Sequence, residues 1–159
     1  KHELCAALVR AKKLEVISVW NPSFLLVMMN YIRENAQALG LEGEVSFQAL
    51  WPRLKLISCW SSAHAEPMAK QLQSLFPNVM VQGKGLLATE APMTIPWMRA
   101  DGFVPLVDEV YFEFETEQGE LLTIAEIEQG QRYRVIISQK GGLCRYRMGD
   151  VSESKSFPF

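Results

Sequence analysis

Cysteine and histidine are scarce in this sequence. It has three cysteines, at positions 5, 59 and 144, and two histidines, at positions 2 and 64. An odd number of widely separated cysteines argues against a framework of disulfides, and no pair of these residues has the spacing of zinc ligands. The cysteine usage therefore predicts a reducing, cytoplasmic setting.

Long apolar runs and a surplus of charge of either sign are also lacking. The longest apolar run, residues 24–29, is far shorter than the roughly 18 residues that a membrane-spanning helix needs. Lysine and arginine total 16, aspartate and glutamate total 18, and the formal net charge is −2. Because no basic surplus is present to bind phosphates, we expect no nucleic-acid partner. Because no apolar run is long enough to span a bilayer, we expect no membrane partner.

The length of 159 residues is that of one domain or of part of a larger one. No internal repeat and no long linker rich in glycine, serine or proline divides it. The chain begins at Lys1 rather than at methionine and ends on an apolar Ser-Phe-Pro-Phe segment, whereas termini are usually polar. We therefore interpret residues 1–159 as one domain fragment of a longer protein.

The first half of the chain alternates apolar, strand-like segments with helix-like segments. Strands are expected at residues 14–20, 54–60 and 78–82, and helices at 3–13, 21–39, 47–50 and 64–75. Asn21 and Pro22 form a helix start, as a cap residue followed by a proline, and Gly40 ends that helix. This alternation predicts a parallel βαβ layer over residues 1–82, and hence an α/β fold.

The second half, residues 101–159, has the period-two alternation of antiparallel strands. Strands are expected at residues 107–115, 121–124, 133–138 and 143–147. In the first of these strands, the apolar positions alternate with a mostly acidic set, which we interpret as a solvated sheet face. The acidic set is Glu109, Glu113 and Glu115. Between the halves, residues 83–100 form a loop at the carboxyl edge of the parallel strands, where α/β folds bind ligands.

Residues 82–90, Gln-Gly-Lys-Gly-Leu-Leu-Ala-Thr-Glu, directly follow the third expected strand and form the first candidate site. Gly83 and Gly85 allow the backbone to approach a ligand closely. The Thr89 hydroxyl can donate to a phosphate oxygen, and Glu90 offers the hard oxygen ligands that suit Mg²⁺. These are parts of a nucleotide site, although the P-loop pattern is absent. The same residues also fit a glycine turn with a polar cap.

Residues 145–150, Arg-Tyr-Arg-Met-Gly-Asp, form the second candidate site. The pattern predicts that a strand ends, that Gly149 turns the chain and that Asp150 follows. A carboxylate in this place can accept hydrogen bonds from both hydroxyls of a ribose. The structural alternative is a cross-strand ion pair from the arginines, together with a β-turn at Gly149 and Asp150.

Two other features carry structural interpretations. Ser62 and His64 stand two residues apart, but the Gly-x-Ser-x-Gly elbow of a hydrolase is absent. We interpret Ser62 as the cap of a helix with Glu66 in its first turn. The tryptophans could stack on a base, but Trp20 and Trp60 end expected strands, and we assign them to packing.

Five segments, spread over residues 19–150, carry a family resemblance. They are VWNPSFLLVMMNYIREN, LWPRLKLISCW, GKGLLATEAPMTIP, PLVDEVYFEFE and KGGLCRYRMGD. Together they resemble the acyl-adenylate-forming, firefly luciferase-like superfamily. More narrowly, they resemble the Gretchen Hagen (auxin-responsive promoter) family of acyl acid–amido synthetases, in its bacterial form. The resemblance implies a central fragment of the large N-terminal domain of an adenylate-forming enzyme.

The resemblance implies an ATP-dependent ligase that works in two steps. A carboxylic acid attacks the α-phosphorus of MgATP to give an acyl-adenylate and pyrophosphate, and an amine, usually of an amino acid, then takes the acyl group. By this resemblance, Thr89 matches the hydroxyl that contacts the α-phosphate. Glu90 matches the acid that helps to hold Mg²⁺, and Asp150 matches the acid that binds the ribose. The segment that matches the one along the adenine is Gly83, Lys84, Gly85 and Leu86.

The sequence departs from the family pattern in three places. Leu86 stands where many relatives have a tyrosine that stacks on adenine, and the phosphate loop rich in Ser, Thr and Gly is absent. After Asp150 the sequence diverges from the segment that leads to a C-terminal domain with a catalytic lysine. We therefore expect this fragment alone to be inactive. The alternatives are a non-catalytic module for nucleotide binding or protein interaction, and a hydrolase that uses Ser62 and His64.

Overall fold

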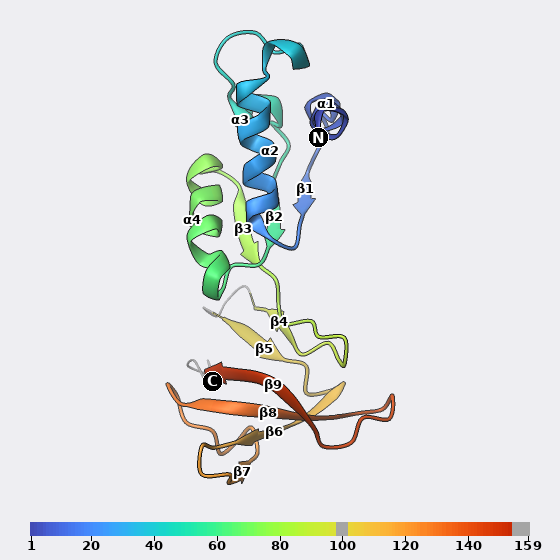
Figure 1. Cartoon of the computed structure of the whole chain (residues 1–159), viewed down its shortest axis with the longest axis vertical. Coiled ribbons are helices and arrows are strands. Elements are labelled where there is room, and N and C mark those ends of the chain that lie inside the picture. Colours follow the sequence, from blue (N-terminus) through green and yellow to red (C-terminus); the bar gives the residue numbers. More distant parts are fainter. Residues whose placement is uncertain (98–101, 154–159) are drawn as a thin grey trace. The chain divides into compact units, whose positions relative to one another are not determined.

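The computed structural model describes residues 1–97 and 102–153. It divides into two compact units, Lys1–Lys84 and Gly85–Phe159, whose helices and strands are labelled in Figure 1. Each unit has its own apolar core. Within the described ranges, no helix has both the length and the apolar character needed to cross a bilayer.

The first unit is a three-stranded parallel sheet in the order β1-β2-β3, with helices between the strands. Its elements are α1 (His2–Arg10), β1 (Val16–Ser18), α2 (Pro22–Glu34), the 3₁₀ helix η1 (Gln37–Leu39), α3 (Phe47–Leu50), β2 (Leu56–Cys59), the 3₁₀ helix η2 (Ala63–Ala65), α4 (Glu66–Leu75) and β3 (Met80–Gly83). Both crossovers run in the same direction across the sheet, so right-handed connections place α2 and α4 on one face, where they contact each other. The predicted parallel βαβ layer is confirmed.

Helix α2 begins at the predicted cap. The Asn21 side chain accepts a hydrogen bond from the backbone N–H of Ser23 at 2.9 Å, and Pro22 occupies the first turn. Further along the helix, buried side chains recur three or four residues apart, which is the spacing of one helix face. They include Leu25, Met28, Met29 and Ile32. This face packs into the core of the first unit.

The end of α2 differs from the prediction, because the helix stops at Glu34 and does not continue to Leu39. The side-chain amide of Asn35 donates to the carbonyl of Tyr31 at 2.9 Å. Asparagine competes in this way for the backbone groups of a helix and so favours helix ends. The separate 3₁₀ helix η1 follows, and it is η1 that Gly40 ends, in a left-handed conformation at φ 73°.

The cap predicted at Ser62 is wrong. The 3₁₀ helix η2 intervenes, and α4 has Ala65 at its N-cap with no side-chain cap hydrogen bond. Pro67 sits in the first turn of α4, where its missing N–H costs nothing. The start of this helix is therefore set by the proline rather than by the serine. Glu66 does lie in the first turn, as predicted.

The second unit is antiparallel, as predicted. Its elements are β4 (Thr94–Pro96), β5 (Phe103–Pro105), β6 (Val110–Glu115), β7 (Leu121–Leu122), β8 (Arg132–Gln139) and β9 (Tyr146–Glu153). β4 pairs with β5, and the other four strands form a sheet in the order β7-β6-β8-β9. The apolar positions of β6, Val110, Phe112 and Phe114, are buried against β8 side chains such as Val135 and Ile137.

The acidic set on β6 is not simply a solvated face. Arg145 donates two hydrogen bonds to Glu113, at 3.0 and 2.8 Å, and Arg147 donates to Glu115 at 2.5 Å. Glu115 is only 6% exposed. Because β8 lies between β6 and β9, the pair from Arg147 joins strands that are not neighbours, and Arg145 reaches β6 from the residue just before β9. Thus the solvated-face prediction is wrong for Glu113 and Glu115, and the ion-pair interpretation of the arginines is confirmed.

Candidate functional site

The chain after Lys84 forms a tight hairpin over residues 86–94, with the predicted Thr-Glu pair at its tip. Its backbone hydrogen bonds run from Met93 N–H to the Leu86 carbonyl at 2.9 Å and from Ala88 N–H to the Ala91 carbonyl at 3.1 Å. Ala91 and Met93, on the returning arm, are buried in the core of the second unit. The tip is therefore held by both the hairpin and the core.

Gly85, at the base of this hairpin, has no room for a side chain. A Cβ at this position would lie 1.9 Å from the carbonyl oxygen of Thr94. The Thr94 hydroxyl also accepts a hydrogen bond from the backbone N–H of Leu86 at 2.7 Å. The glycine thus allows two segments of backbone to approach each other. Leu86 is 37% exposed and offers an apolar surface without an aromatic ring.

Glu90 receives hydrogen bonds from three other residues of the second unit. The Thr89 hydroxyl donates to its Oε2 at 2.9 Å, and the Tyr146 hydroxyl to its Oε1 at 3.5 Å. The side-chain amide of Gln139 donates to the Glu90 carbonyl at 3.3 Å. Tyr146 and Gln139 were assigned no role from the sequence. Tyr146 lies in the quoted Arg-Tyr-Arg-Met-Gly-Asp motif, whereas nothing in the sequence points to Gln139, which is 49 residues away from Glu90.

These contacts favour the ionised form of the Glu90 carboxylate. Its pKa is lowered from the ordinary value. The largest cause is the hydrogen bond from the Thr89 hydroxyl, followed by a hydrogen bond from its own backbone N–H, and the Tyr146 hydroxyl makes a smaller contribution. Partial burial acts in the opposite direction and raises the pKa. A lowered pKa means that the carboxylate keeps its negative charge at a more acidic pH than an ordinary glutamate does. At neutral pH the tip of the hairpin therefore presents an anionic oxygen donor that can hold a cation.

The Thr89 hydroxyl has one hydrogen to donate, and in this structure Glu90 accepts it. To donate to a phosphate oxygen, the hydroxyl has to rotate away from Glu90. A cation on the Glu90 carboxylate would favour this rotation, since the hydroxyl would then present its oxygen lone pairs to the cation and its hydrogen elsewhere.

Substitutions at Thr89 and Tyr146 are expected to raise the Glu90 pKa. Thr89→Val removes the larger cause of the lowered pKa and Tyr146→Phe a smaller one, so the rise should be greater in Thr89→Val. The measurement is a carboxyl ¹³C NMR titration of the 159-residue chain without metal. Glu126, which bonds to Thr123, serves as an internal control that should not change. An unchanged Glu90 pKa in Thr89→Val would contradict this origin of the shift.

Asp150 lies on β9, the strand that carries Tyr146. The turn predicted at Gly149 is wrong, because β9 continues through both residues. Ile136 pairs with Arg147 and Arg134 with Val151, so residues 148–150 lie opposite the single residue Val135 as a β-bulge. Bulges bend a strand and redirect its side chains, and they are over-represented next to active sites. The Asp150 side chain itself lies outside the described part of the structure.

Gly83 and Lys84 belong to the first unit, whereas Gly85, Leu86, Thr89, Glu90 and Asp150 belong to the second. Gly83 is the last residue of β3, and Lys84 follows it. The Lys84 ammonium donates to the Ser18 hydroxyl at 2.9 Å and lies 5.5 Å from the centroid of the Trp20 ring. The side chain of Lys84 is thus placed at the carboxyl edge of the parallel sheet, where α/β folds bind ligands.

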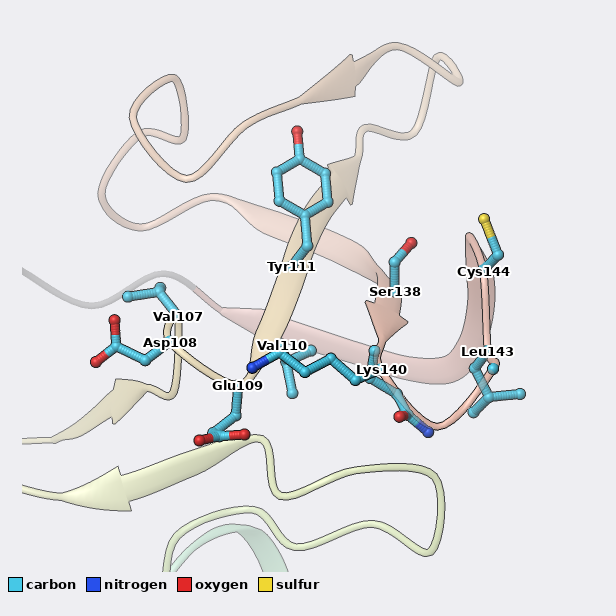
Figure 2. Close-up of a pocket in the computed structure, with 11 residues that line it drawn as sticks. Val107, Asp108, Glu109, Val110, Tyr111, Ser138, Lys140, Leu143 and Cys144 are labelled. Carbon is cyan, nitrogen blue, oxygen red and sulfur yellow. The ribbon is translucent and has the colours of Figure 1, made fainter.

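An open pocket of about 450 Å³ lies in the second unit, between the start of β6 and the turn that joins β8 to β9. Figure 2 shows Tyr111, Ser138 and Cys144 pointing to one side of the ribbon and Glu109 to the other. The lining carries charges of both signs, from Asp108, Glu109 and Lys140. Gln139, which bonds to the Glu90 carbonyl, also lines it. Of the predicted site residues whose side chains the structure describes, none lines this pocket.

The described residues contain no group of three or more His, Cys, Asp or Glu side chains arranged to hold a metal. The donors at the hairpin tip are the Glu90 carboxylate and the Thr89 hydroxyl. This small, hard-oxygen set fits Mg²⁺, which keeps several waters and is usually bound through one or two carboxylates together with substrate phosphates.

Comparisons with known proteins point to one family. Residues 103–158 match the family model of the GH3 family central domain. An indole-3-acetic acid-amido synthetase, GH3.3 of Arabidopsis thaliana, is 40% identical over 53 residues, which cover 30% of this chain and 9% of that protein. A jasmonoyl–L-amino acid synthetase, GH3.5 of Oryza sativa subsp. japonica, is 27% identical over 132 residues, which cover 69% of this chain and 22% of that protein. The chain thus spans less than a quarter of these relatives.

Two solved structures have the same fold. The AtGH3.15 acyl acid amido synthetase in complex with 2,4-DB matches with a TM-score of 0.79 and 15% identity, over 98% of this chain and 36% of that one. A second structure of a GH3.15 acyl acid amido synthetase matches with a TM-score of 0.77 and 14% identity, over 98% of this chain and 37% of that one. The predicted α/β fold is confirmed. Together, these similarities support the family that the sequence motifs indicate, the GH3 family.

Proposed function

We propose that this chain is part of an ATP-dependent ligase that activates a carboxylic acid as an acyl-adenylate and transfers the acyl group to an amine, usually of an amino acid. The similarity to amido synthetases supports this reading. The single observation that carries it is the hairpin tip, where the Glu90 carboxylate accepts hydrogen bonds from the hydroxyls of Thr89 and Tyr146. An anionic oxygen and a hydroxyl on one rigid tip are suited to a metal-bound nucleotide.

Glu90 and Thr89 are the residues that would hold Mg²⁺ together with the phosphates of ATP. When bound, Mg²⁺ supplies positive charge that offsets the charge developing on the phosphate oxygens. Thr89 would orient the α-phosphate after its hydroxyl turns away from Glu90. Tyr146 would keep the carboxylate in position, because its hydroxyl lies on the other oxygen of Glu90.

The proposed route of bond changes is the one that the family resemblance implies. The carboxylate oxygen of the acid forms a bond to the α-phosphorus, and the bond from that phosphorus to the β-phosphate bridging oxygen breaks, which releases pyrophosphate. The amine nitrogen then forms a bond to the acyl carbon, AMP leaves, and the amine loses one proton. The chain contributes position and charge to these steps rather than a covalent intermediate.

Asp150→Ala is expected to raise the apparent KM for ATP by about tenfold or more, since each lost charge-assisted hydrogen bond to a ribose hydroxyl costs roughly 1.5–3 kcal/mol. The measurement is the ATP dependence of adenylate formation by the complete protein that contains this chain. Asp108→Ala, at an exposed aspartate of the same unit, is the control and should leave the KM unchanged. An unaltered KM in Asp150→Ala removes Asp150 from the nucleotide site.

We also propose that residues 1–159 are a central piece of a longer ligase of bacterial type, and that this piece alone does not turn over. We further propose that the protein is cytoplasmic. The cytoplasmic location is supported by the three cysteines, which are all free thiols. Burial raises the pKa of the Cys5 and Cys59 thiols, so these two remain protonated and unreactive.

Amide formation tests the whole reaction. The complete protein is incubated with MgATP, a panel of carboxylic acids and a mixture of amino acids, and the products are identified by mass spectrometry. The proposal expects a conjugate with a new amide bond, formed in amounts equal to the AMP released. If AMP forms with no amide, the transfer step is wrong. If the protein binds ATP but makes neither product, the non-catalytic nucleotide-binding alternative is favoured.

A further inference from the structure

The two residues that flank the β8–β9 turn, residues 140–145, both contact Glu90. Gln139 ends β8, and its side-chain amide donates to the Glu90 carbonyl at 3.3 Å. Tyr146 begins β9, and its hydroxyl donates to Glu90 Oε1 at 3.5 Å. The first contact holds the backbone of Glu90, and the second holds its carboxylate. The position of Glu90 therefore depends on the conformation of the β8–β9 turn.

Packing does little to fix the β8–β9 turn. None of residues 140–145 is buried, and the turn borders the open pocket of about 450 Å³ (Figure 2). Gly141 and Gly142 also give the backbone conformational freedom. At the start of the turn, Gly141 N–H donates to the side-chain carbonyl of Gln139, and Gly142 N–H donates to the Gln139 backbone carbonyl at 3.2 Å. The conformation of the turn thus depends on polar contacts.

Arg145 makes the polar contacts at the end of the turn. Its Nε and Nη2 donate to the two carboxylate oxygens of Glu113, at 3.0 and 2.8 Å, and the Glu113 side chain is only 15% exposed. The backbone N–H of Arg145 donates to the Ser138 hydroxyl at 2.9 Å. A two-pronged pair of this kind fixes the orientation of the guanidinium as well as its distance. Arg145 is therefore held by β6 through its side chain and by β8 through its backbone.

The backbone of Arg145 adopts an unfavourable conformation. Its φ is 47°, in the left-handed region, and no other non-glycine residue in the described ranges has a positive φ. A residue with a side chain adopts this conformation at a cost that glycine avoids. Such residues persist where surrounding contacts compensate for the cost, and they cluster at functional sites. Since Tyr146 comes next in the chain, the conformation of Arg145 sets the direction in which Tyr146 leaves the turn.

We propose that Arg145 is a positioning residue for Glu90. The hydrogen-bonded ion pair with Glu113 holds the left-handed backbone of Arg145, and this backbone directs Tyr146 to the Glu90 carboxylate. Arg145 thus acts through Tyr146 and not by touching a substrate. Its effect on the geometry of Glu90 stands on these contacts alone, whereas its effect on the metal dependence of the reaction rests on the proposed function.

The geometric effect is measured on the 159-residue chain without metal, from the carboxyl ¹³C resonance of Glu90 at one neutral pH. Tyr146→Phe removes the hydroxyl and gives the reference displacement of this resonance. Arg145→Gln should displace it in the same direction, because Tyr146 is no longer held in place. Arg134→Gln is the matched control, at an exposed arginine of β8 that forms no ion pair within the described ranges, and it should leave the resonance unchanged.

Two further variants separate the ion pair from the backbone. Arg145→Gly removes the ion pair but adopts a φ of 47° without strain, so it should displace the Glu90 resonance less than Arg145→Gln does. Glu113→Gln breaks the same ion pair from the other strand. Combined with Arg145→Gln it should add little, because both substitutions remove one shared contact. These two variants keep the test decisive if Arg145→Gln does not fold.

The effect on the reaction is measured in the complete protein. Arg145→Gln should raise the Mg²⁺ concentration for half-maximal adenylate formation by about threefold to tenfold, the usual effect of one lost hydrogen bond. A variant that is only less stable has less active protein, but its half-maximal Mg²⁺ concentration is unchanged. Arg134→Gln should match the parent protein in this titration.

The positioning role and the proposed reaction can fail separately. The positioning role is overturned if Arg145→Gln and Glu113→Gln leave the Glu90 resonance in place, or if Arg134→Gln displaces it equally. An unchanged Mg²⁺ titration in an active Arg145→Gln protein also overturns it. If the resonance moves as expected but the complete parent protein forms no acyl-adenylate with any acid, Arg145 positions Glu90 and the ligase function is wrong.

Discussion

Glu90→Gln in the complete protein is expected to raise the Mg²⁺ concentration needed for half-maximal adenylate formation by about tenfold to a hundredfold, the usual range for disturbing a metal site. The substitution keeps the size of the side chain and one oxygen, which can accept from Thr89 or from Tyr146, and it removes the negative charge. Since Mg²⁺ prefers charged oxygen ligands, the loss should appear in the metal dependence. The measurement is a Mg²⁺ titration at saturating ATP.

The second unit contains a well-matched control for this experiment. Glu126 accepts hydrogen bonds from both the backbone N–H and the hydroxyl of Thr123, each at 2.7 Å, and its pKa is lowered for that reason. Glu126 is therefore another glutamate that is hydrogen-bonded to a threonine, but in the sequence it lies outside the hairpin of residues 86–94. Glu126→Gln should leave the Mg²⁺ titration unchanged. An equal effect of both substitutions would mean that Glu90 has no special place in the metal site.

Gly85→Ala is expected to destabilise the second unit by about 3 kcal/mol, at the upper end of the usual cost of overpacking. The added methyl group would lie 1.9 Å from a backbone oxygen of Thr94, and a backbone atom cannot move aside as a flexible side chain can. The base of the hairpin must therefore open, which would also displace Thr89 and Glu90. Urea unfolding of the 159-residue chain, followed by NMR signals from β6 and β8, measures the loss.

Gly149→Ala is the control for this stability measurement. A Cβ at Gly149 would meet no atom within 4 Å, so the same chemical change should have little effect on the unfolding midpoint. If Gly85→Ala proves as stable as Gly149→Ala, the close approach at the base of the hairpin is not a constraint on the fold, and the rigid tip loses its physical basis.

Local signals predicted the start of elements better than their ends. Asn21 and Pro22 lie next to each other and act through one turn, so the start of α2 could be predicted from the sequence. The end of α2 depends on a hydrogen bond from the side-chain amide of Asn35 to the Tyr31 carbonyl. This hydrogen bond favours the end of the helix at this point over its continuation. The start of α4 was misplaced because the 3₁₀ helix η2 precedes it. The parallel layer itself was predictable, since it follows from the order of strands and helices.

Contacts over long sequence distances explain the remaining errors. The acidic face of β6 was misread because Arg145 and Arg147 come 32 residues later and reach over an intervening strand. At the candidate site, Thr89 and Glu90 are adjacent and could be proposed together, but Tyr146 is 56 residues from Glu90. Trp20 and Trp60 are 56% and 44% exposed, and they were assigned to packing because a strand end does not reveal whether anything covers it.

The exchange of labelled pyrophosphate into ATP by the complete protein is the most direct test of acid activation. With MgATP and a panel of aromatic and aliphatic carboxylic acids, we expect exchange that requires an acid, requires Mg²⁺ and falls sharply in Glu90→Gln. Two results would contradict the formation of an acyl-adenylate. One is exchange of pyrophosphate without any acid. The other is the absence of exchange with every acid, in a protein that is shown to be folded and to bind ATP.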